Sequence, residues 1–250
     1  MSSLTIGGTA YRCQPWPKPI IRPAITWGQN TAGYWYGFDR GTAQDIYEAE
    51  ITFTDTDAVI NSLKGVLNSN RGAISLTSLQ TPIFAPNVDQ TGTISCSAVD
   101  FGQREHVQWA GTGSNIQTLT VRFRAISPTL LAPTASLATL RIQERYQGDH
   151  SWPINKHFAY NQTGSYIDHG SDVGTLKASF QQTLTESRAI LRYILNTARA
   201  DSFTLPTFSG LTYPFGVSRG AGPFSCMVKS VQVYRKDLNR WILNLEFVEA

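Results

Sequence analysis

The sequence predicts a mainly β protein of the α+β class, with two tandem domains that are each a β-sandwich or barrel flanked by one helix. Three observations lead to this prediction. The order of strand-like and helical segments in the first half recurs in the second half. Each half holds several short strand-like segments but only one helical pattern. Hydrophobic residues make up 41% of the 250 residues and aromatic residues 11%, which is enough for substantial cores.

The first repeated unit begins with a strand at residues 46–54, where apolar and polar side chains partly alternate. Residues 54–57 follow, and their side-chain oxygens can accept the free N–H groups of a first helical turn. Apolar residues three and four apart then predict a helix over residues 58–68 with one apolar face. A stop is indicated at residues 70–72, which end in glycine.

The second half repeats this order with a strand at residues 175–183, a cap at residues 185–187 and a helix over residues 189–198. In both halves the unit continues with a short strand and a loop rich in Pro and Gly. It ends with a strand near a cysteine and a closing strand in which apolar and polar residues alternate. The closing strands are at residues 119–123 and 243–247, and they are 124 residues apart, whereas the helices are 128 apart. The differences in length therefore fall in loops.

A linker is indicated at residues 127–134, where Pro128 and Pro133 would interrupt any strand ladder. This linker predicts a first domain at residues 1–127 and a second domain at residues 128–250. The first domain begins with an extended arm, because three prolines within residues 15–19 exclude a helix there.

Charge and hydropathy exclude several classes of protein. Lys and Arg number 21 and Asp and Glu 18, which gives a net charge of +3 and argues against a dedicated nucleic-acid coat. The absence of an 18-residue apolar run and of a signal-like start predicts a chain with no membrane anchor and no conventional secretion. Cys13, Cys96 and Cys226 lack the spacing of a disulfide framework or zinc site and are interpreted as small buried apolar residues.

No catalytic or metal-binding constellation stands out, so we expect no enzyme, no cofactor and no metal. Histidines and aspartates gather loosely without ligand spacing and are interpreted as loop residues; they are His150, His157, His169, Asp149, Asp168 and Asp172. Two carboxylate pairs are interpreted as helix capping and as the solubility of an outer strand face, rather than as glycosidase carboxylates; they are Asp55 with Asp57, and Glu48 with Glu50.

The arm at residues 15–21 and the aromatic stretch at residues 34–38 are the leading candidates for contacts with a partner, and a structural turn is the alternative interpretation. Aromatic residues beside glycine gather at residues 27–38 and, more weakly, at residues 157–166. A glycine-rich turn at residues 216–222 lacks the Lys-Ser/Thr of a phosphate loop but carries an arginine. The candidate partner contacts are Trp16, Tyr34, Trp35, Tyr36 and Arg219.

Taken together, the duplicated unit, the low charge and the lack of a catalytic motif resemble tail proteins of tailed bacteriophages, specifically the tail-tube fold shared by tube, distal-tail and baseplate-hub proteins. The resemblance covers most of the chain. It is carried by residues 46–54, 58–68, 74–76 and 96–123, and by residues 175–183, 189–198, 203–205 and 226–247.

The resemblance implies a structural virion protein, made in the host cytoplasm and located in a phage tail or baseplate. It implies a homo-oligomeric ring, with a trimer of pseudo-sixfold symmetry favoured and a hexamer as the alternative. The expected partners are other tail or baseplate proteins, with the genome only passing through a lumen. The loops at residues 79–92 and 207–222 would reach neighbouring subunits or the ring above. Tube, adaptor, distal-tail and hub roles stay open.

A second hypothesis is a carbohydrate-binding β-sandwich of a host-recognition protein. In that case Trp27, Tyr34, Trp35 and Tyr36 would form a stacking surface for sugar rings.

Overall fold

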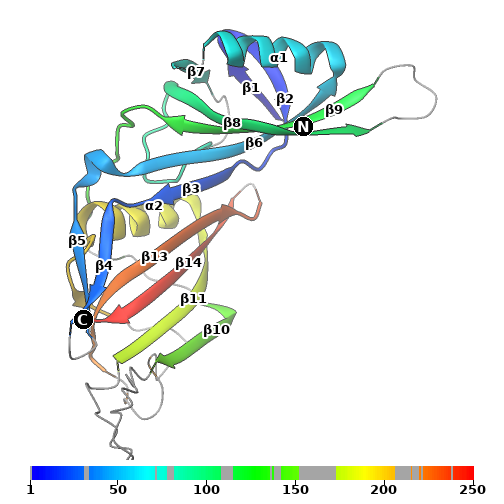
Figure 1. Ribbon diagram of the computed structural model, residues 1–250. Coiled ribbons are helices and arrows are strands. Elements are labelled where there is room, and N and C mark those ends of the chain that lie inside the picture. The colour runs from blue at the N-terminus through cyan, green and yellow to red at the C-terminus, as the bar shows by residue number, and fades with distance from the viewer. Residues whose placement is uncertain are drawn as a thin grey trace, which may run out of the picture. The chain divides into compact units, whose positions relative to one another are not determined.

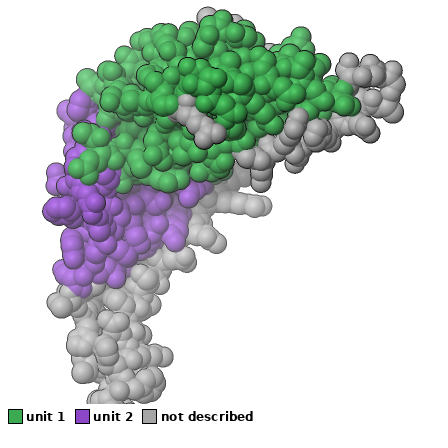
Figure 2. Space-filling view, turned by 45° about the horizontal axis from the view of Figure 1, so that its top comes forward, with its two compact units in different colours: residues 1–23, 43–132, 233–241 green, residues 24–42, 133–232, 242–250 purple. Residues whose placement is uncertain are grey.

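The computed structural model describes residues 2–30, 34–70, 72–77, 82–107, 115–135, 137, 142–151, 173–205, 215, 220, 222–237 and 239–250. Within these ranges the side chains of residues 2, 102–107 and 142–151 are not placed. The chain divides into two compact units, which Figure 2 draws in green and purple. Unit 1 comprises residues 1–23, 43–132 and 233–241, and unit 2 comprises residues 24–42, 133–232 and 242–250. The domain boundary expected between residues 127 and 128 stays a prediction. Residues 24–42, from the first half of the sequence, belong to unit 2, and residues 233–241, from the second half, belong to unit 1.

Unit 1 is built on a closed six-stranded barrel whose order is β2-β1-β7-β8-β9-β6, with β2 pairing with β6 to complete the circle (Figure 1). The strands are β1 (Ser2–Ile6), β2 (Thr9–Cys13), β6 (Ile46–Thr56), β7 (Ile74–Thr77), β8 (Thr93–Val107) and β9 (Ile116–Ala125). A further strand, β3 (Lys18–Arg22), pairs with the other side of β6 in antiparallel fashion. The segment predicted as an extended arm is therefore partly an edge strand, where Pro19 is tolerated.

The alternating patterns predicted the inside of this barrel. On β9, every second residue from Gln117 to Ala125 is buried, including Leu119, Val121 and Phe123. On β6, Ile51 and Phe53 face the same core. Burying side chains of this size contributes about 1.5–3 kcal/mol each relative to exposure. The barrel is therefore held mainly by its alternating strands.

The helix of unit 1, α1 (Asp57–Ser69), follows β6 directly, and a single 3-10 turn, η1 (Thr42–Gln44), precedes that strand. Its residues Ile60, Leu63 and Leu67 lie three and four apart and are almost completely buried. Thr56 is the N-cap residue, but its side chain makes no capping hydrogen bond. The predicted helix at residues 58–68 is confirmed, because a continuous apolar face is enough to dock it.

The described part of the loop predicted at residues 79–92 is partly buried in unit 1. Ile83, Phe84 and Val88 are buried in the core of unit 1. Gln90 holds the loop, because its Oε1 accepts hydrogen bonds from the N–H groups of Ile83 and Phe84 at 2.6 and 2.8 Å. Apolar burial thus overrides the turn-rich composition of the segment.

Unit 2 contains a five-stranded sheet in the order β10-β11-β14-β13-β12. Its strands are β10 (Ile142–Ser151), β11 (Val173–Thr183), β12 (Phe203–Thr204), β13 (Ser225–Arg235) and β14 (Arg240–Glu249). A separate two-stranded hairpin of β4 (Ile25–Gln29) and β5 (Trp35–Asp39) also belongs to this unit. Neither helix among the described residues is both long and apolar enough to cross a membrane.

The second helix, α2 (Leu184–Tyr193), begins earlier than predicted. Thr183 is the N-cap residue, and its Oγ1 accepts a hydrogen bond from the Glu186 N–H at 3.3 Å. The Glu186 carboxylate in turn accepts from the Thr183 N–H at 2.9 Å, which completes a capping box. The cap predicted at residues 185–187 was therefore wrong. The helix continues as a π turn, η2 (Ile194–Ala198), rather than as α-helix throughout.

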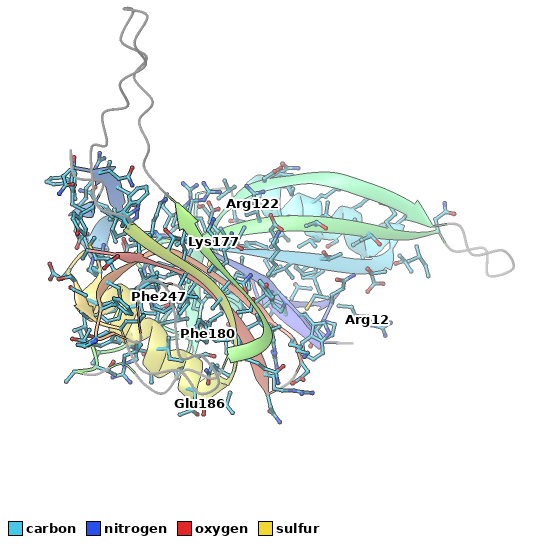
Figure 3. All side chains as sticks on the ribbon, turned by 90° about the horizontal axis from the view of Figure 1, so that it is seen from below. Arg12, Arg122, Lys177, Phe180, Glu186 and Phe247 are labelled. Carbon is cyan, nitrogen blue, oxygen red and sulfur yellow. The ribbon has the colours of Figure 1, made fainter. Side chains whose placement is uncertain are left out.

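The two units share one topology. The order β3-β6-β9-β8-β7 in unit 1 matches β10-β11-β14-β13-β12 in unit 2, and in both the helix follows the second of these strands. Side-chain pairs match as well: Phe53 and Phe123 make an edge-on ring contact at 6.5 Å, as do Phe180 and Phe247, both labelled in Figure 3, at 6.2 Å. These partners are offset by 127 and 124 residues, which are nearly the offsets seen in the sequence. The mainly β, α+β fold class is confirmed.

Polar pairs and cysteines follow the same correspondence. Thr52 and Thr120 hydrogen-bond through their hydroxyls at 3.0 Å, and the residues offset from them by 127 and 124, Ser179 and Asn244, hydrogen-bond at 2.7 Å. Cys96 pairs in register with Ile74, and the other unit pairs Cys226 with Phe203. A shared strand order together with shared pairs indicates one module present twice.

Candidate interaction surfaces

The β4–β5 hairpin carries most of the predicted aromatic contacts, and its register sorts them onto two faces. Side chains alternate across a strand, so directly paired residues share a face. One face holds the pairs Trp27 with Gly37 and Gln29 with Trp35. The opposite face holds Gly28 with Tyr36 and Thr26 with Phe38. The aromatic side chains of this hairpin therefore divide between two surfaces.

The first face of the hairpin is docked on unit 2 through an ion pair. The Arg199 Nε and Nη2 donate to the two carboxylate oxygens of Asp39 at 2.5 and 2.7 Å. The Arg199 side chain is only 9% exposed, and its Nη1 also donates to the Leu195 carbonyl at 2.8 Å. These hydrogen bonds from Arg199 lower the pKa of Asp39 below its ordinary value. The carboxylate therefore stays ionised at neutral pH.

Arg199 sits immediately after η2 with a positive φ of 46°, a region that side-chain-bearing residues rarely adopt. Beside it, the chain approaches the hairpin so closely that a Cβ at Gly37 would lie 2.7 Å from the Ala200 methyl group. Gly37 is therefore required for this contact. On β13, the Lys229 Nζ lies 3.6 Å from the centre of the Trp35 ring, which is a cation–π contact.

The second face of the hairpin is open to solvent. Tyr36 is 55% exposed and Phe38 is 65% exposed, the highest value among large hydrophobic side chains in the described part of the chain. The Tyr36 ring covers Gly28, because a Cβ there would lie 2.6 Å from the ring. Two neighbouring aromatic rings on a solvent-facing strand are typical of a contact surface rather than of a core.

The four residues proposed as a sugar-stacking platform do not share one face. Trp27 and Trp35 lie on the docked side, whereas Tyr36 lies on the exposed side. Tyr34 precedes β5 and belongs to its turn, where its N–H donates to the Asn30 side chain at 3.0 Å. Phe38, the most exposed of these aromatics, belongs to the predicted contact stretch but was not among the residues singled out for sugar stacking.

The remaining candidate contacts lie elsewhere. Trp16 is in the connection between β2 and β3, is 41% exposed, and has the Arg235 guanidinium 4.9 Å from its ring centre. Arg219 lies outside the described residues. The side chains of the loose histidine and aspartate group between residues 149 and 172 also lie outside the described part.

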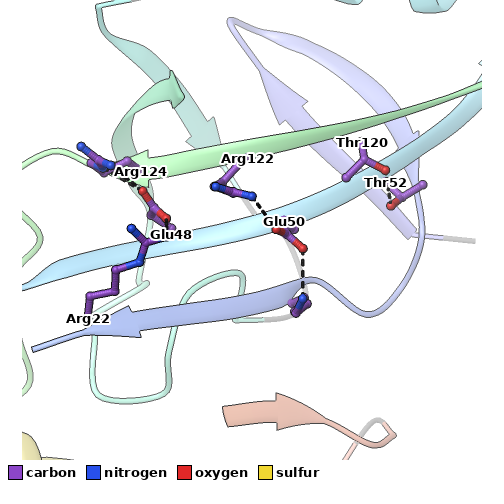
Figure 4. A network of polar contacts seen from close by, with 8 residues as sticks. Arg22, Glu48, Glu50, Thr52, Thr120, Arg122 and Arg124 are labelled. Atoms are coloured by element: carbon purple, nitrogen blue, oxygen red, sulfur yellow. Dashed lines mark hydrogen bonds and ion pairs between the residues drawn. The ribbon is translucent and has the colours of Figure 1, made fainter. Parts of the chain in front are cut away.

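The second candidate surface is polar and lies on the outer face of β3, β6 and β9, and Figure 4 shows its ion pairs. Glu50 pairs with Lys18 at 3.3 Å and with Arg122 at 3.1 Å. Glu48 pairs with Arg124 at 2.7 Å and with Arg22 at 3.4 Å. The four basic side chains are 33–68% exposed, so cations form the outer layer of this surface.

The interpretation of Glu48 as a solubilising surface residue was wrong. Its side chain is only 1% exposed, because the two arginines from β3 and β9 cover it. A buried carboxylate of this kind depends on its partners to offset the cost of desolvation. Each glutamate is held between two cations from the neighbouring strands, so the two carboxylates tie β3, β6 and β9 together.

The cysteines agree with the interpretation as buried apolar residues. All three are free and buried. Burial raises the pKa of Cys96 and of Cys226 to about 12, so both stay protonated at neutral pH. Thiols of this kind are poor nucleophiles. Within the described residues, no group of three or more His, Cys, Asp or Glu side chains is placed to hold a metal ion.

No known protein-family model matches the chain, and no curated protein sequence matches it either.

Proposed function

We propose that this chain is a structural ring protein of a bacteriophage tail or baseplate. In the proposed ring, three chains place six similar units around a lumen, with a ring of six chains as the alternative. The partners would be other tail or baseplate proteins, and the location would be the virion. The observation that carries this proposal is the repeated strand order with a helix after the second strand in each unit.

The repeat supports a ring for a physical reason. Two units with one topology present similar surfaces twice along the chain, so a contact that joins neighbouring units can recur around a closed assembly. The end strands β3 and β10 occupy equivalent positions in the two sheets, and end strands are natural sites for contacts with other chains. The exposed rings of Tyr36 and Phe38 supply a further apolar surface for such contacts.

The proposal is tested by the mass and shape of the purified full-length protein. Native mass spectrometry should give three or six times 27.6 kDa, and negative-stain electron microscopy should show rings with a central hole. Tailed virions labelled with an antibody against the chain should show it in the tail. A protein that stays monomeric at high concentration and is missing from virions would overturn the proposal.

A further inference from the structure

The solvent-facing side of the β4–β5 hairpin carries two aromatic side chains next to each other. Directly paired residues share a face, and the register pairs Thr26 with Phe38 and Gly28 with Tyr36, on the side away from Trp35. Tyr36 is 55% exposed and Phe38 is 65% exposed. They are two positions apart on one strand, so their side chains leave the backbone about 7 Å apart. The two aromatic side chains therefore form one continuous exposed surface.

The Tyr36 side chain is seated on a glycine. A Cβ at Gly28 would lie 2.6 Å from both the Cζ and the hydroxyl oxygen of Tyr36, and 3.1 Å from its Cε1. The far end of Tyr36 thus rests directly on the Gly28 backbone, where any larger residue would displace it. Its outward side stays open, because more than half of the side chain is exposed. An aromatic side chain that is already in place loses little conformational freedom when a ligand stacks on it.

Hydrogen-bonding groups border this aromatic surface. Thr26 is exposed and lies directly opposite Phe38. The ladder runs one pair beyond the two strands, because the Arg40 N–H donates to the Ala24 carbonyl at 2.9 Å. Alternation along the strand then places the exposed Arg40 on the same side as Phe38. The Tyr36 hydroxyl is a third polar group, so the hairpin face combines an apolar centre with polar edges.

The size of the face suits a small ligand better than a folded protein. Two strands of five residues cover roughly 17 Å by 10 Å, or about 170 Å², whereas a stable protein interface buries about 800 Å² on each partner. A pyranose sugar has the matching chemistry, with C–H groups on its flat faces and hydroxyls around its edge. The negative face of an aromatic ring attracts such C–H groups, which carry partial positive charge.

We propose that this face of the hairpin binds an oligosaccharide of β-linked pyranose sugars. Tyr36 and Phe38 stack on the C–H faces of neighbouring sugars, and Thr26, Arg40 and the Tyr36 hydroxyl bind the sugar hydroxyls. The sequence alone placed a stacking surface on residues of both hairpin faces, and the register confines it to Tyr36 and Phe38. This sugar site goes beyond the proposed ring assembly and does not depend on it.

Saturation-transfer NMR on the full-length protein tests the stacking directly. The probes are six-sugar oligomers of β-1,4-linked glucose and of β-1,4-linked N-acetylglucosamine. Irradiating the aromatic protons of the protein should transfer saturation to the ring C–H protons of the sugars. Tyr36→Ala and Phe38→Ala should each weaken binding about tenfold, because the stacked apolar surface is lost. Trp16→Ala removes an exposed aromatic side chain outside the hairpin and should leave binding unchanged. No transfer to either probe would overturn the sugar site.

A glycine substitution tests the arrangement of the two aromatic side chains rather than their presence. Gly28→Ala keeps both but places a methyl group where the end of Tyr36 rests, so Tyr36 must swing away. Thermal unfolding should stay unchanged, because only the far end of an exposed side chain is displaced, and sugar binding should fall several-fold. Gly65→Ala is the matched control, since a Cβ there meets no atom within 4 Å. Equal binding by these two variants would overturn the inference.

Native mass spectrometry of the same proteins separates this inference from the proposed function. A chain that assembles into rings of three or six but binds neither probe overturns the sugar site alone. A chain that binds the oligosaccharides but stays monomeric overturns the ring assembly alone. If Tyr36→Ala and Phe38→Ala abolish assembly, and the unchanged protein binds neither probe, another chain occupies these side chains and the sugar site is overturned.

Discussion

The two units keep the same interior and differ outside it. The edge-on phenylalanine pair and the buried cysteine occur in both. On the outer face, however, the positions of Glu50 and Arg122 correspond by the 127- and 124-residue offsets to Lys177 and Glu246, so the two charges are exchanged. Glu246 pairs instead with Lys229, at 3.6 Å. Packing constrains the interior tightly, whereas a solvent-facing pair is replaceable at little cost.

The second difference between the units is whether the sheet closes into a barrel. In unit 1 the β1–β2 hairpin bridges β7 and β6 and turns the shared five strands into part of a barrel. In unit 2 the described strands form an open sheet that ends at the two-residue strand β12, and the β4–β5 hairpin is docked by side chains rather than by a shared ladder. One unit is thus completed by backbone pairing and the other by an ion pair and aromatic contacts.

The largest expected effect tests whether the two cores are energetically equivalent. Phe123→Ala and Phe247→Ala each remove one ring of the matched pair and should cost about 3–5 kcal/mol of unfolding free energy. Urea unfolding, with hydrogen exchange read separately for each unit, measures both. Phe38→Ala is the matched control, because its side chain is 65% exposed, and it should change stability by less than about 0.5 kcal/mol. A cost in one unit less than half that in the other would break the equivalence.

The outer face gives the next largest effect. Glu48→Gln removes a buried charge that holds Arg22 and Arg124, and we expect a loss of about 3 kcal/mol in the stability of unit 1. Glu50→Gln is the control: that carboxylate is 24% exposed, and its loss should cost about 1 kcal/mol. Urea unfolding measures both variants. Equal costs would show that burial does not distinguish the two glutamates.

The docked hairpin should be sensitive to acid. Because Arg199 lowers the pKa of Asp39, the ion pair contributes stability above pH 3.8, the ordinary aspartate value, and loses it as the pH falls through the lowered pKa. Hydrogen exchange of β4 and β5, corrected for intrinsic rates, should therefore rise in acid. Asp39→Asn should weaken the docking by about 2 kcal/mol at neutral pH and remove the acid step.

The exposed ion pair between Asp237 and Arg240 provides the control for that experiment. Asp237→Asn should leave the exchange of β4 and β5 unchanged at every pH, because this pair lies in the β13–β14 turn. Acid-dependent exchange that persists in Asp39→Asn would show that another group controls the docking of the hairpin.

Periodicity predicted the parts of the fold whose shape is decided locally. The strand at residues 46–54 and the closing strand at 243–247 were recognised because apolar and polar residues alternate there, which matches their alternating burial. The helices were recognised because apolar residues recur every three or four positions. Strands β1 to β5 were missed, since each spans only five residues and several contain Pro or Gly. Their pairing is decided by distant partners rather than by local pattern.

The candidate surfaces show the same limit. Aromatic residues beside glycine predicted the hairpin as a contact surface, but the choice of docked face depends on Arg199, 160 residues away from Asp39. The burial of Glu48 likewise depends on arginines from two other strands. The local sequence around Asp39 or Glu48 does not indicate which distant arginine will pair with it. The π turn η2 also has no periodic signature, because Ile194, Leu195 and Ala198 fit an α-helical face equally well.

The smallest expected effect separates the two helix starts, which are otherwise equivalent. Thr183 and Thr56 are both N-cap residues with extended backbone, and they are 127 residues apart. Only Thr183 uses its side chain, as half of a capping box with Glu186, so Thr183→Ala should destabilise unit 2 by about 1 kcal/mol. Thr56→Ala should have almost no effect on unit 1, because no side-chain hydrogen bond is lost there. Urea unfolding of the two variants measures the difference, and equal losses would mean that backbone geometry, rather than the capping hydrogen bond, sets the start of both helices.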